Sequence, residues 1–337
     1  MSCLDAPGVR VLSAGMRMTD NATMGEYVPL PTALPANRND KHARGETVKL
    51  LLADAGHCLS LALAREANRR RDTELVIVEG TQVTARILAE AKPDALIVPP
   101  LAAPARLAPA EVMAHADAVE ANLELCREYG VPLVWCVSDE LYEDGGDGTL
   151  DEHVTPAPRD ESLKRLIVAG DSVRQRLPRH LIVRLGPLFA LEGAHAWLPG
   201  LIDTLLAGET VRAAEDVILC PTSADAVAMA LIGMLQQQGC GAEAWGAYHL
   251  AGTEPVSPYT FASVVRTQLA THLERQGRDL TLGTLQALHH HHDHPLRRVL
   301  NCRRVLDAFG IHQKPWRLEL SRMLDDWCRL HDKEAAT

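Results

Sequence analysis

The chain has 337 residues, of which 47% are hydrophobic and 4% aromatic, so it can bury a sizeable core built mainly from aliphatic side chains. The formal net charge of −10 argues against a general nucleic-acid-binding protein and against a protein that binds anionic membranes. No apolar stretch approaches the roughly 20 residues that cross a bilayer, and the first residues lack the apolar segment of a signal peptide. The eight cysteines are scattered, which is typical of free thiols, and together these features predict a cytoplasmic protein.

Residues 1–46 mix proline, asparagine, aspartate and lysine without a sustained period, which predicts a disordered extension or a loosely docked arm. From residue 47 onward, short apolar runs alternate with helical patterns. Strands are expected at residues 48–53, 75–78, 95–98, 132–137, 181–185, 216–219 and 248–250. Helices are expected at residues 57–69, 82–91 and 109–129, the last one ended by Gly130.

This alternation predicts an α/β fold with a doubly wound parallel sheet of the Rossmann type. The Rossmann-like, dinucleotide-binding-type domain is expected to span residues 47–190 and to receive further strands near residues 213–225 and 246–252. Residues 191–330 are expected to form a smaller, interleaved C-terminal domain of the substrate-binding type, followed by a tail at residues 331–337.

The first strand-to-helix turn, residues 53–59, stands where a dinucleotide fold places its glycine-rich phosphate loop. Only the middle position, Gly56, is glycine, because Ala53 and Leu59 occupy the outer two. The turn therefore either binds a cofactor weakly or is a plain connection that holds no pyrophosphate. Glu79 follows the second strand, where an acid can accept a hydrogen bond from a ribose 2′-hydroxyl and repel a 2′-phosphate. Any cofactor would then be NAD(H) rather than NADP(H), although a solvated acid at a strand end explains Glu79 equally well.

Ser138 and Asp139 follow the strand at residues 132–137, at the carboxyl edge where doubly wound folds bind ligands. A serine at this place can donate a hydrogen bond to a substrate carbonyl. It can also simply cap the loop that follows the strand.

A set of segments in fixed order connects these positions to a known family. They are the stretch from Val137 to Gly145, Ala169-Gly170-Asp171, Arg184 in an apolar run, Pro221-Thr222 ahead of Asp225, the stretch from Gly246 to Gly252, and Asn301-Cys302-Arg303. With this set, residues 47–330 resemble the dTDP-4-dehydrorhamnose reductases, atypical extended short-chain dehydrogenases that reduce a 4-keto sugar nucleotide with a nicotinamide cofactor. The resemblance implies a substrate pocket near Asp139, Arg184, Arg298 and Asn301, in which Ser138 orients the carbonyl.

The departures from that family concern its catalytic residues. Its members carry a Tyr and a Lys four residues apart on one helix face, where the Lys lowers the phenol pKa and the Tyr passes a proton to the carbonyl oxygen. Counting back from Ala169-Gly170, the Tyr position holds Leu163 and the Lys position holds Ile167. No Tyr in the chain stands four residues before a Lys, and a family Asn on the preceding helix is replaced by His115.

Two functions stay open on this basis. The first is a non-catalytic relative that binds a nucleotide, a sugar nucleotide or a protein partner, with a homodimer as one form of assembly. The second is a divergent NAD(P)H-dependent reductase of a dTDP-4-keto-6-deoxy sugar. In that case Tyr142, His115 or a water molecule would supply the proton.

Residues 289–294 contain five histidines and one aspartate, side chains that suit zinc, nickel or copper. The run can be an exposed loop, a lid over the substrate pocket or a metal site. We expect an exposed loop and no dedicated metal site, because no separate pair of Cys or His ligands at a recognisable spacing accompanies the run.

Overall fold

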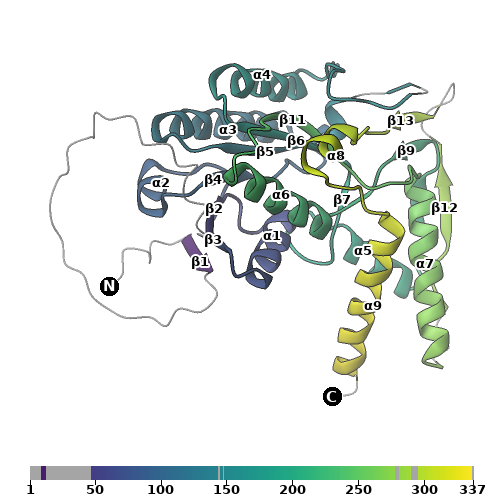
Figure 1. The fold of residues 1–337 in the computed structure, drawn as a ribbon. Helices are drawn as coiled ribbons and strands as arrows, with labels where there is room; N and C mark the ends of the chain where they lie inside the picture. Colours follow the sequence, from purple (N-terminus) through teal and green to yellow (C-terminus); the bar gives the residue numbers. More distant parts are fainter. Residues whose placement is uncertain are drawn as a thin grey trace.

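The computed structural model describes residues 9–12, 47–142, 145–146, 148–277, 281–289 and 295–335. Its centre is a seven-stranded sheet in which six strands are parallel and the edge strand β1 is antiparallel to its neighbour. In order across the sheet the strands are β1 (Val9–Leu12), β3 (Thr73–Val78), β2 (Val48–Leu52), β4 (Ala95–Val98), β5 (Leu133–Ser138), β6 (His180–Leu185) and β11 (Gly246–Leu250). The predicted α/β, doubly wound fold is confirmed (Figure 1).

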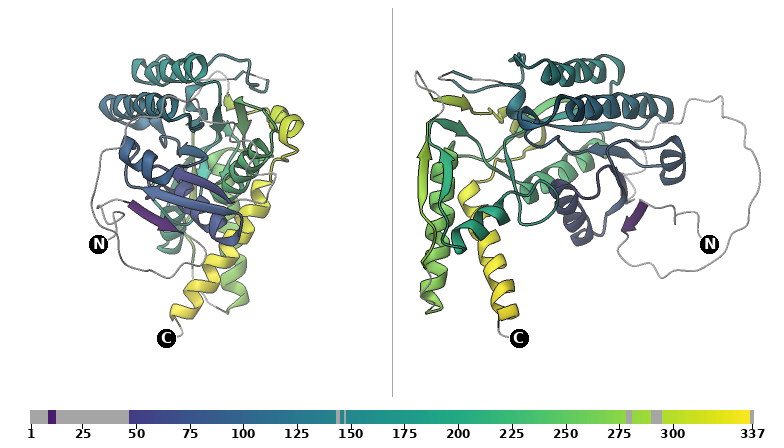
Figure 2. Two further views of the ribbon diagram at one scale, coloured as in Figure 1. Left: turned by 60° about the vertical axis from the view of Figure 1, so that its left-hand side comes forward. Right: turned by 180° about the vertical axis from the view of Figure 1, so that it is seen from behind.

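Helices cover both faces of this sheet, as Figures 1 and 2 show. One face packs against α1 (Cys58–Arg69) and α6 (Ala224–Gly239), and the other against α3 (Pro109–Tyr129) and α4 (Glu161–Arg176). The consecutive Leu50, Leu51 and Leu52 of β2 are all fully buried, with alternate side chains in the two apolar clusters. Burial on both faces explains why the parallel strands are almost continuously hydrophobic in sequence.

Local sequence signals set most of the element boundaries. The predicted end of α3 at Gly130 is confirmed, because Gly130 adopts the left-handed conformation at φ 64°. The helix expected from residue 82 begins later, as α2 (Ala85–Ala91), because the Thr84 side chain accepts a hydrogen bond from the backbone N–H of Ile87 and caps it. Residues 9–12 of the expected extension form β1, which pairs with β3; the rest of residues 1–46 lies outside the described residues.

A third apolar cluster forms the smaller C-terminal part, to the right in Figure 1. It joins three helices, and two small parallel sheets of two strands each lie beside them. The elements are α5 (Leu198–Leu206), α7 (Pro258–Arg275), α9 (Trp316–Ala335), the pair β8 (Val211–Ala214) with β12 (Leu285–Leu288), and the pair β9 (Val217–Leu219) with β13 (Leu296–Arg298).

The chain crosses between the two parts several times. After β7 (Leu188–Phe189) it enters the smaller part, and after β10 (Thr222–Ser223) it returns as α6 and β11; α8 (Arg303–Phe309) later contacts β11. Of the further strands expected for the main sheet, β11 joins it, whereas β8, β9 and β10 lie in two-stranded sheets. The expected strand at residues 216–219 is β9, and β8 precedes it.

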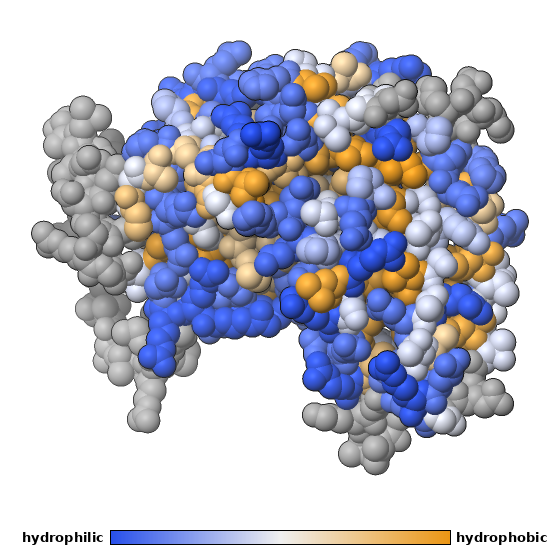
Figure 3. Space-filling model, turned by 45° about the vertical axis from the view of Figure 1, so that its right-hand side comes forward, coloured by the Kyte–Doolittle hydropathy of each residue, from blue (hydrophilic) through white to orange (hydrophobic). Residues whose placement is uncertain are grey.

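In the space-filling view of Figure 3, hydrophilic residues cover much of the visible face, and hydrophobic residues form separate patches between them. Within the described part of the chain, every helix is too short or too polar to cross a membrane.

Candidate functional site

A pocket of about 350 Å³ lies at the carboxyl edge of the main sheet. Doubly wound folds bind their ligands at this edge. The pocket is lined by the start of α1, the segment after β4, the end of β5, the segment after β6 and two residues just ahead of α5. The lining residues are His57, Cys58, Pro100, Leu101, Ala102, Ala103, Arg106, Leu107, Ser138, Asp139, Glu140, Leu185, Gly186, Pro187, Leu188, His195 and Trp197.

Ser138 and Asp139 line the pocket where β5 ends. The Ser138 hydroxyl oxygen accepts a hydrogen bond from the backbone N–H of Glu140 at 3.2 Å, so the serine caps the short helix η4 (Asp139–Leu141). This geometry is compatible with both predicted roles, the cap of a loop and a donor to a substrate carbonyl, because the capping Ser138 also lines the pocket.

Asp139 is 1% exposed, and its Oδ2 atom lies 3.8 Å from Nε of Arg298 on β13. Burial raises the pKa of Asp139 to about 7, and the Arg298 guanidinium opposes this rise. The carboxyl group therefore changes charge close to neutral pH, inside a ligand-sized pocket. Of the expected substrate-pocket residues, Asp139 lines the pocket and Arg298 is held against it.

His57 is a polar residue in the lining of the same pocket. Its Nδ1 atom accepts a hydrogen bond from the backbone N–H of Leu59 at 3.0 Å and caps α1, so the ring proton is on Nε2. Burial, followed by the neighbouring His195, lowers the pKa of His57 to about 3. The centroids of the His57 and His195 rings lie 5.5 Å apart.

Tyr142 and Arg184 belong to a separate buried cluster around His249, outside the pocket lining. The Tyr142 hydroxyl and Nη1 of Arg184 each lie 3.2 Å from Nε2 of His249, and Nδ1 of His249 lies 3.1 Å from the carbonyl oxygen of Leu150. Nδ1 therefore carries the proton and donates to Leu150, while Nε2 accepts. Burial lowers the pKa of His249 to about 3 and raises the pKa of Tyr142 to about 12. The Tyr142 hydroxyl also donates to the carbonyl oxygen of Val154 at 3.3 Å, so it has two partners within this cluster.

Two more predicted positions have structural partners. The Asn301 side-chain oxygen accepts a hydrogen bond from the backbone N–H of Arg303 at 2.9 Å, at the start of α8. The buried His115 accepts from the indole N–H of Trp135, with 3.4 Å between Nε2 and Nε1. The structure brings neither residue to the pocket lining.

The positions of the family Tyr and Lys are apolar in space as well as in sequence. Leu163 is 4% exposed and belongs to the cluster of α3, α4 and the sheet, and Ile167 packs against the same cluster. The helix that carries them starts normally, because the Asp160 carboxylate accepts hydrogen bonds from the backbone N–H groups of Ser162 and Leu163. Among the residues that the structure describes, those lining the pocket include no Tyr and no Lys.

The expected cofactor turn is shaped by the core and by a distant segment. Leu59 is fully buried in the cluster of α1, α6 and the sheet. Gly56 is exposed, and its carbonyl oxygen accepts a hydrogen bond from the backbone N–H of Ala194 at 2.7 Å. Glu79 is exposed directly after β3, which is compatible with either reading of that acid.

Sequence reasoning missed three residues that line the pocket: His57, His195 and Trp197. His57 stands inside the cofactor turn and could have been noted as a polar residue at a helix start. Nothing in the spacing marks His195 or the 41% exposed Trp197, because a fold in the chain after β7 brings them to the sheet edge.

Within the described ranges, no group of three His, Cys, Asp or Glu side chains could hold a metal ion. Only His289 of the histidine run is described, and its Nε2 atom lies 3.6 Å from Oε2 of Glu215. Residues 290–294 lie outside the described residues. The exposed loop, the lid over the pocket and the metal site therefore all stay predictions.

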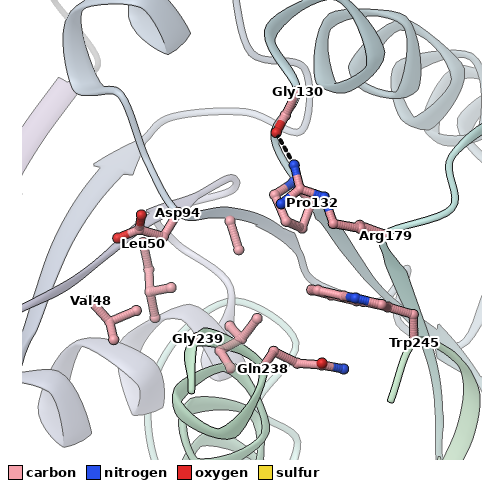
Figure 4. A pocket seen from close by; sticks show the side chains of 11 residues that line it. Val48, Leu50, Asp94, Gly130, Pro132, Arg179, Gln238, Gly239 and Trp245 are labelled. Atoms are coloured by element: carbon pink, nitrogen blue, oxygen red, sulfur yellow. Dashed lines mark hydrogen bonds between the residues drawn. The ribbon is translucent and has the colours of Figure 1, made fainter. Parts of the chain in front are cut away.

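A second, smaller pocket lies at the opposite, amino-terminal edge of the sheet (Figure 4). There Nη2 of Arg179 donates to the carbonyl oxygen of Gly130, and Gln238 and Trp245 lie nearby. Its volume of about 40 Å³ suits a few water molecules rather than an organic ligand. The carboxyl edge is therefore the better candidate site.

Comparisons with known proteins agree with this fold. Among curated proteins, the "Probable low-salt glycan biosynthesis reductase Agl14" of Haloferax volcanii is 27% identical over 145 residues, which are 42% of this chain and 47% of that protein. The matched part thus spans about half the length of this relative.

Solved structures show the same fold at lower identity. The dTDP-4-dehydrorhamnose reductase of Bacillus anthracis in complex with NADP has a TM-score of 0.67 and 17% identity, covering 83% of this chain and 99% of that one. The corresponding protein of Clostridium acetobutylicum has a TM-score of 0.66 and 15% identity, covering 82% and 99%. The GDP-mannoheptose C4 reductase of Campylobacter jejuni with NADP bound has a TM-score of 0.62 and 13% identity, covering 83% and 98%.

The family model described as "RmlD substrate binding domain" matches residues 58–328, from the start of α1 to the last turns of α9. The resemblance found in the sequence is thereby confirmed, and the chain belongs to this sugar-nucleotide reductase-like family.

Proposed function

We propose that this protein is a non-catalytic member of its family, which binds a nucleotide sugar in the pocket beside Ser138 and Asp139. The observation that carries the proposal is that apolar side chains stand at the positions of the catalytic Tyr and Lys: Leu163 is buried in an apolar cluster, and the partly buried Ile167 packs against it. A hydrocarbon side chain cannot give a proton to a carbonyl oxygen or lower the pKa of a phenol.

The surroundings support binding without turnover. The helix that carries Leu163 and Ile167 is intact and packed, so the lost groups are not replaced by a local rearrangement. Tyr142, which could have taken over the proton transfer, is held by His249 and has a raised pKa. The pocket itself is kept at about 350 Å³, with polar groups on several sides. Such a pocket has the volume and mixed character of a small-molecule site.

The test combines turnover with binding. We expect no NADH or NADPH oxidation with dTDP-4-dehydrorhamnose above a rate about 10²–10⁴-fold below that of a family enzyme, the usual effect of losing a positioned acid. We also expect dTDP-sugars to raise the melting temperature, since a ligand at 100 times its Kd stabilises the native state by about 2.7 kcal/mol. The Ser138→Ala variant should lose part of this stabilisation, and Thr271→Ala, on the exposed side of α7, should keep it.

A second function, a divergent NAD(P)H-dependent reductase, is favoured by one observation. The pKa of Asp139 near 7 suits a general acid, and the carboxyl group lines the pocket. Asp139 would give its proton to the carbonyl oxygen of the substrate, while a nicotinamide cofactor would supply the hydride to the carbonyl carbon. Turnover by the wild-type protein that disappears in Asp139→Asn would establish this function and refute the first.

A further inference from the structure

Residues 192–195 cross the N-terminus of α1, although they follow it by more than a hundred residues in the chain. The backbone N–H of Cys58 donates to the carbonyl oxygen of Ala194 at 3.1 Å, and the N–H of Ala194 donates to the carbonyl oxygen of Gly56 at 2.7 Å. These bonds form an isolated parallel bridge between His57 and Ala194. The turn between β2 and α1 is therefore paired with another part of the same chain.

The backbone N–H groups that a dinucleotide would use at this turn already have partners, and the pairing supplies one of them. In Rossmann-type folds the pyrophosphate sits at the N-terminus of the helix after the first strand and accepts hydrogen bonds from its free backbone N–H groups. Here the N–H of Cys58 is bonded to Ala194, and the N–H of Leu59 is bonded to the imidazole of His57 at 3.0 Å. The N–H of His57 itself donates to the carbonyl oxygen of Asp54 at 3.1 Å.

Gly193 allows the segment to approach α1 this closely. A Cβ atom at this position would lie 2.7 Å from Cα and 2.9 Å from the backbone N of Cys58, distances that side chains do not adopt. Gly193 also has a φ of +94°, which other residues rarely adopt. The contact with the helix start is therefore specific to glycine.

Charged side chains hold the segment from the other side. Glu192 forms an ion pair with Arg65 of α1, and Arg65 also lies 2.7 Å from the carboxylate of Asp225 on α6. His195, the last residue of the segment, lines the ligand pocket. One short segment thus closes the helix start and borders the ligand pocket.

We propose that residues 192–195 are an internal ligand of the α1 N-terminus, which occupies the position of a dinucleotide pyrophosphate and excludes NAD(H) and NADP(H). The protein then offers the pocket beside Asp139 for a ligand while its dinucleotide position is closed. This proposal concerns the cofactor alone and is independent of whether a nucleotide sugar binds.

The test uses Gly193→Val, which cannot keep the contact because its side chain would overlap the backbone of Cys58. The matched control is Gly241→Val, because Gly241 has a similar φ of +91° but no atom within 4 Å of an added Cβ. ADP-ribose and NADH serve as probes in titration calorimetry. We expect binding to the wild type and to Gly241→Val to stay at or below the detection limit. Gly193→Val should bind at least about tenfold more tightly than that limit, because the binding-competent form becomes the main one.

Hydrogen exchange at the Cys58 amide reports the contact without any ligand. This amide should be protected in the wild type and in Gly241→Val and should exchange faster in Gly193→Val. If Gly193→Val does not fold, the surface variant Glu192→Ala takes its place, with a smaller expected gain in affinity of about two- to fivefold.

Tight binding of ADP-ribose to the wild type would overturn the proposal. So would an opened segment, seen by exchange at Cys58, that brings no gain in binding. Failure of dTDP-sugars to stabilise the wild type would instead count against the proposed function, so the two ideas fail separately.

Discussion

At the scale of residues, the site contains polar groups, and burial controls the charge that they carry. Asp139 is almost fully buried, and Nε of Arg298 lies 3.8 Å from its Oδ2 atom, too far for a close hydrogen bond. Glu140 adds a like charge, and the Ser138 hydroxyl favours the carboxylate. The balance leaves the pKa of Asp139 well above its ordinary value, which is typical of residues at functional sites.

A pH-dependent stability follows for Asp139. Its native pKa of about 7 exceeds the unfolded value of 3.8, so between these pH values the native state keeps a proton that the unfolded state has released. This contribution to the free energy of unfolding is therefore lost as pH rises, by up to about 1.4 kcal/mol per pH unit. Asp139→Asn should match the wild type near pH 4 and be more stable above pH 7, as measured by urea unfolding.

The control for this measurement is Asp307→Asn, because Asp307 is exposed on α8 and its difference from the wild type should stay nearly constant with pH. A pH-independent difference for Asp139→Asn would show that the carboxyl group stays ionised in the native protein.

At the scale of elements, α4 carries apolar side chains at the two positions where the family resemblance places a Tyr and a Lys. Leu163 and Ile167 stand four residues apart and so share a face, as the family's Tyr and Lys do. This face packs into the cluster with α3, and ion pairs from Arg165 to Asp117 and Glu120 tie the two helices together at their rim. In the structure, this face of α4 therefore makes packing contacts with the cluster of α3 and the sheet.

Truncating this face should cost stability in proportion to burial. Leu163→Ala should lower the free energy of unfolding by about 2–5 kcal/mol, because it leaves a cavity in a packed cluster. Val168→Ala, on the same helix but 52% exposed, should change it by less than about 0.5 kcal/mol. Chemical denaturation measures both values. Equal small effects would mean that Leu163 points into a space able to hold another group, such as the family's phenol.

At the scale of the whole molecule, the two parts share one chain that passes back and forth between them. The face of the sheet that carries Leu50 and Leu52 is covered by α1 and by α6, and α6 follows the first excursion into the smaller part. The strand β11 completes the sheet beside β6 from a position still later in the chain. A division at residue 190 therefore separates the sheet from α6, one of the two helices on this face, and from the strand β11.

We expect a fragment of residues 47–190 not to fold by itself. Without α6 the apolar side chains that it covers on one sheet face would be left in water, and without β11 the edge of β6 would be unpaired. Circular dichroism should show no cooperative unfolding for this fragment, whereas residues 47–335 should unfold cooperatively. Cooperative unfolding of the short fragment would show that the expected domain of residues 47–190 is autonomous.

The sequence by itself determined the fold class and the absence of the catalytic pair. Both depend on local periods: continuous apolar runs for buried parallel strands, and a spacing of four residues on a helix face. The end of α3 at Gly130 was readable for the same reason, since a helix stop is a local backbone event.

Only the tertiary structure decided which side chains meet at the site. It placed Arg298 beside Asp139, bound Tyr142 to His249 across 107 residues, and laid residues 192–195 over the start of α1. These contacts depend on the paths of loops between elements, which leave no period in the sequence. The contact of residues 192–195 with the turn at residues 53–59 could therefore not be predicted, because Gly193, which permits it, stands far from this turn in the sequence.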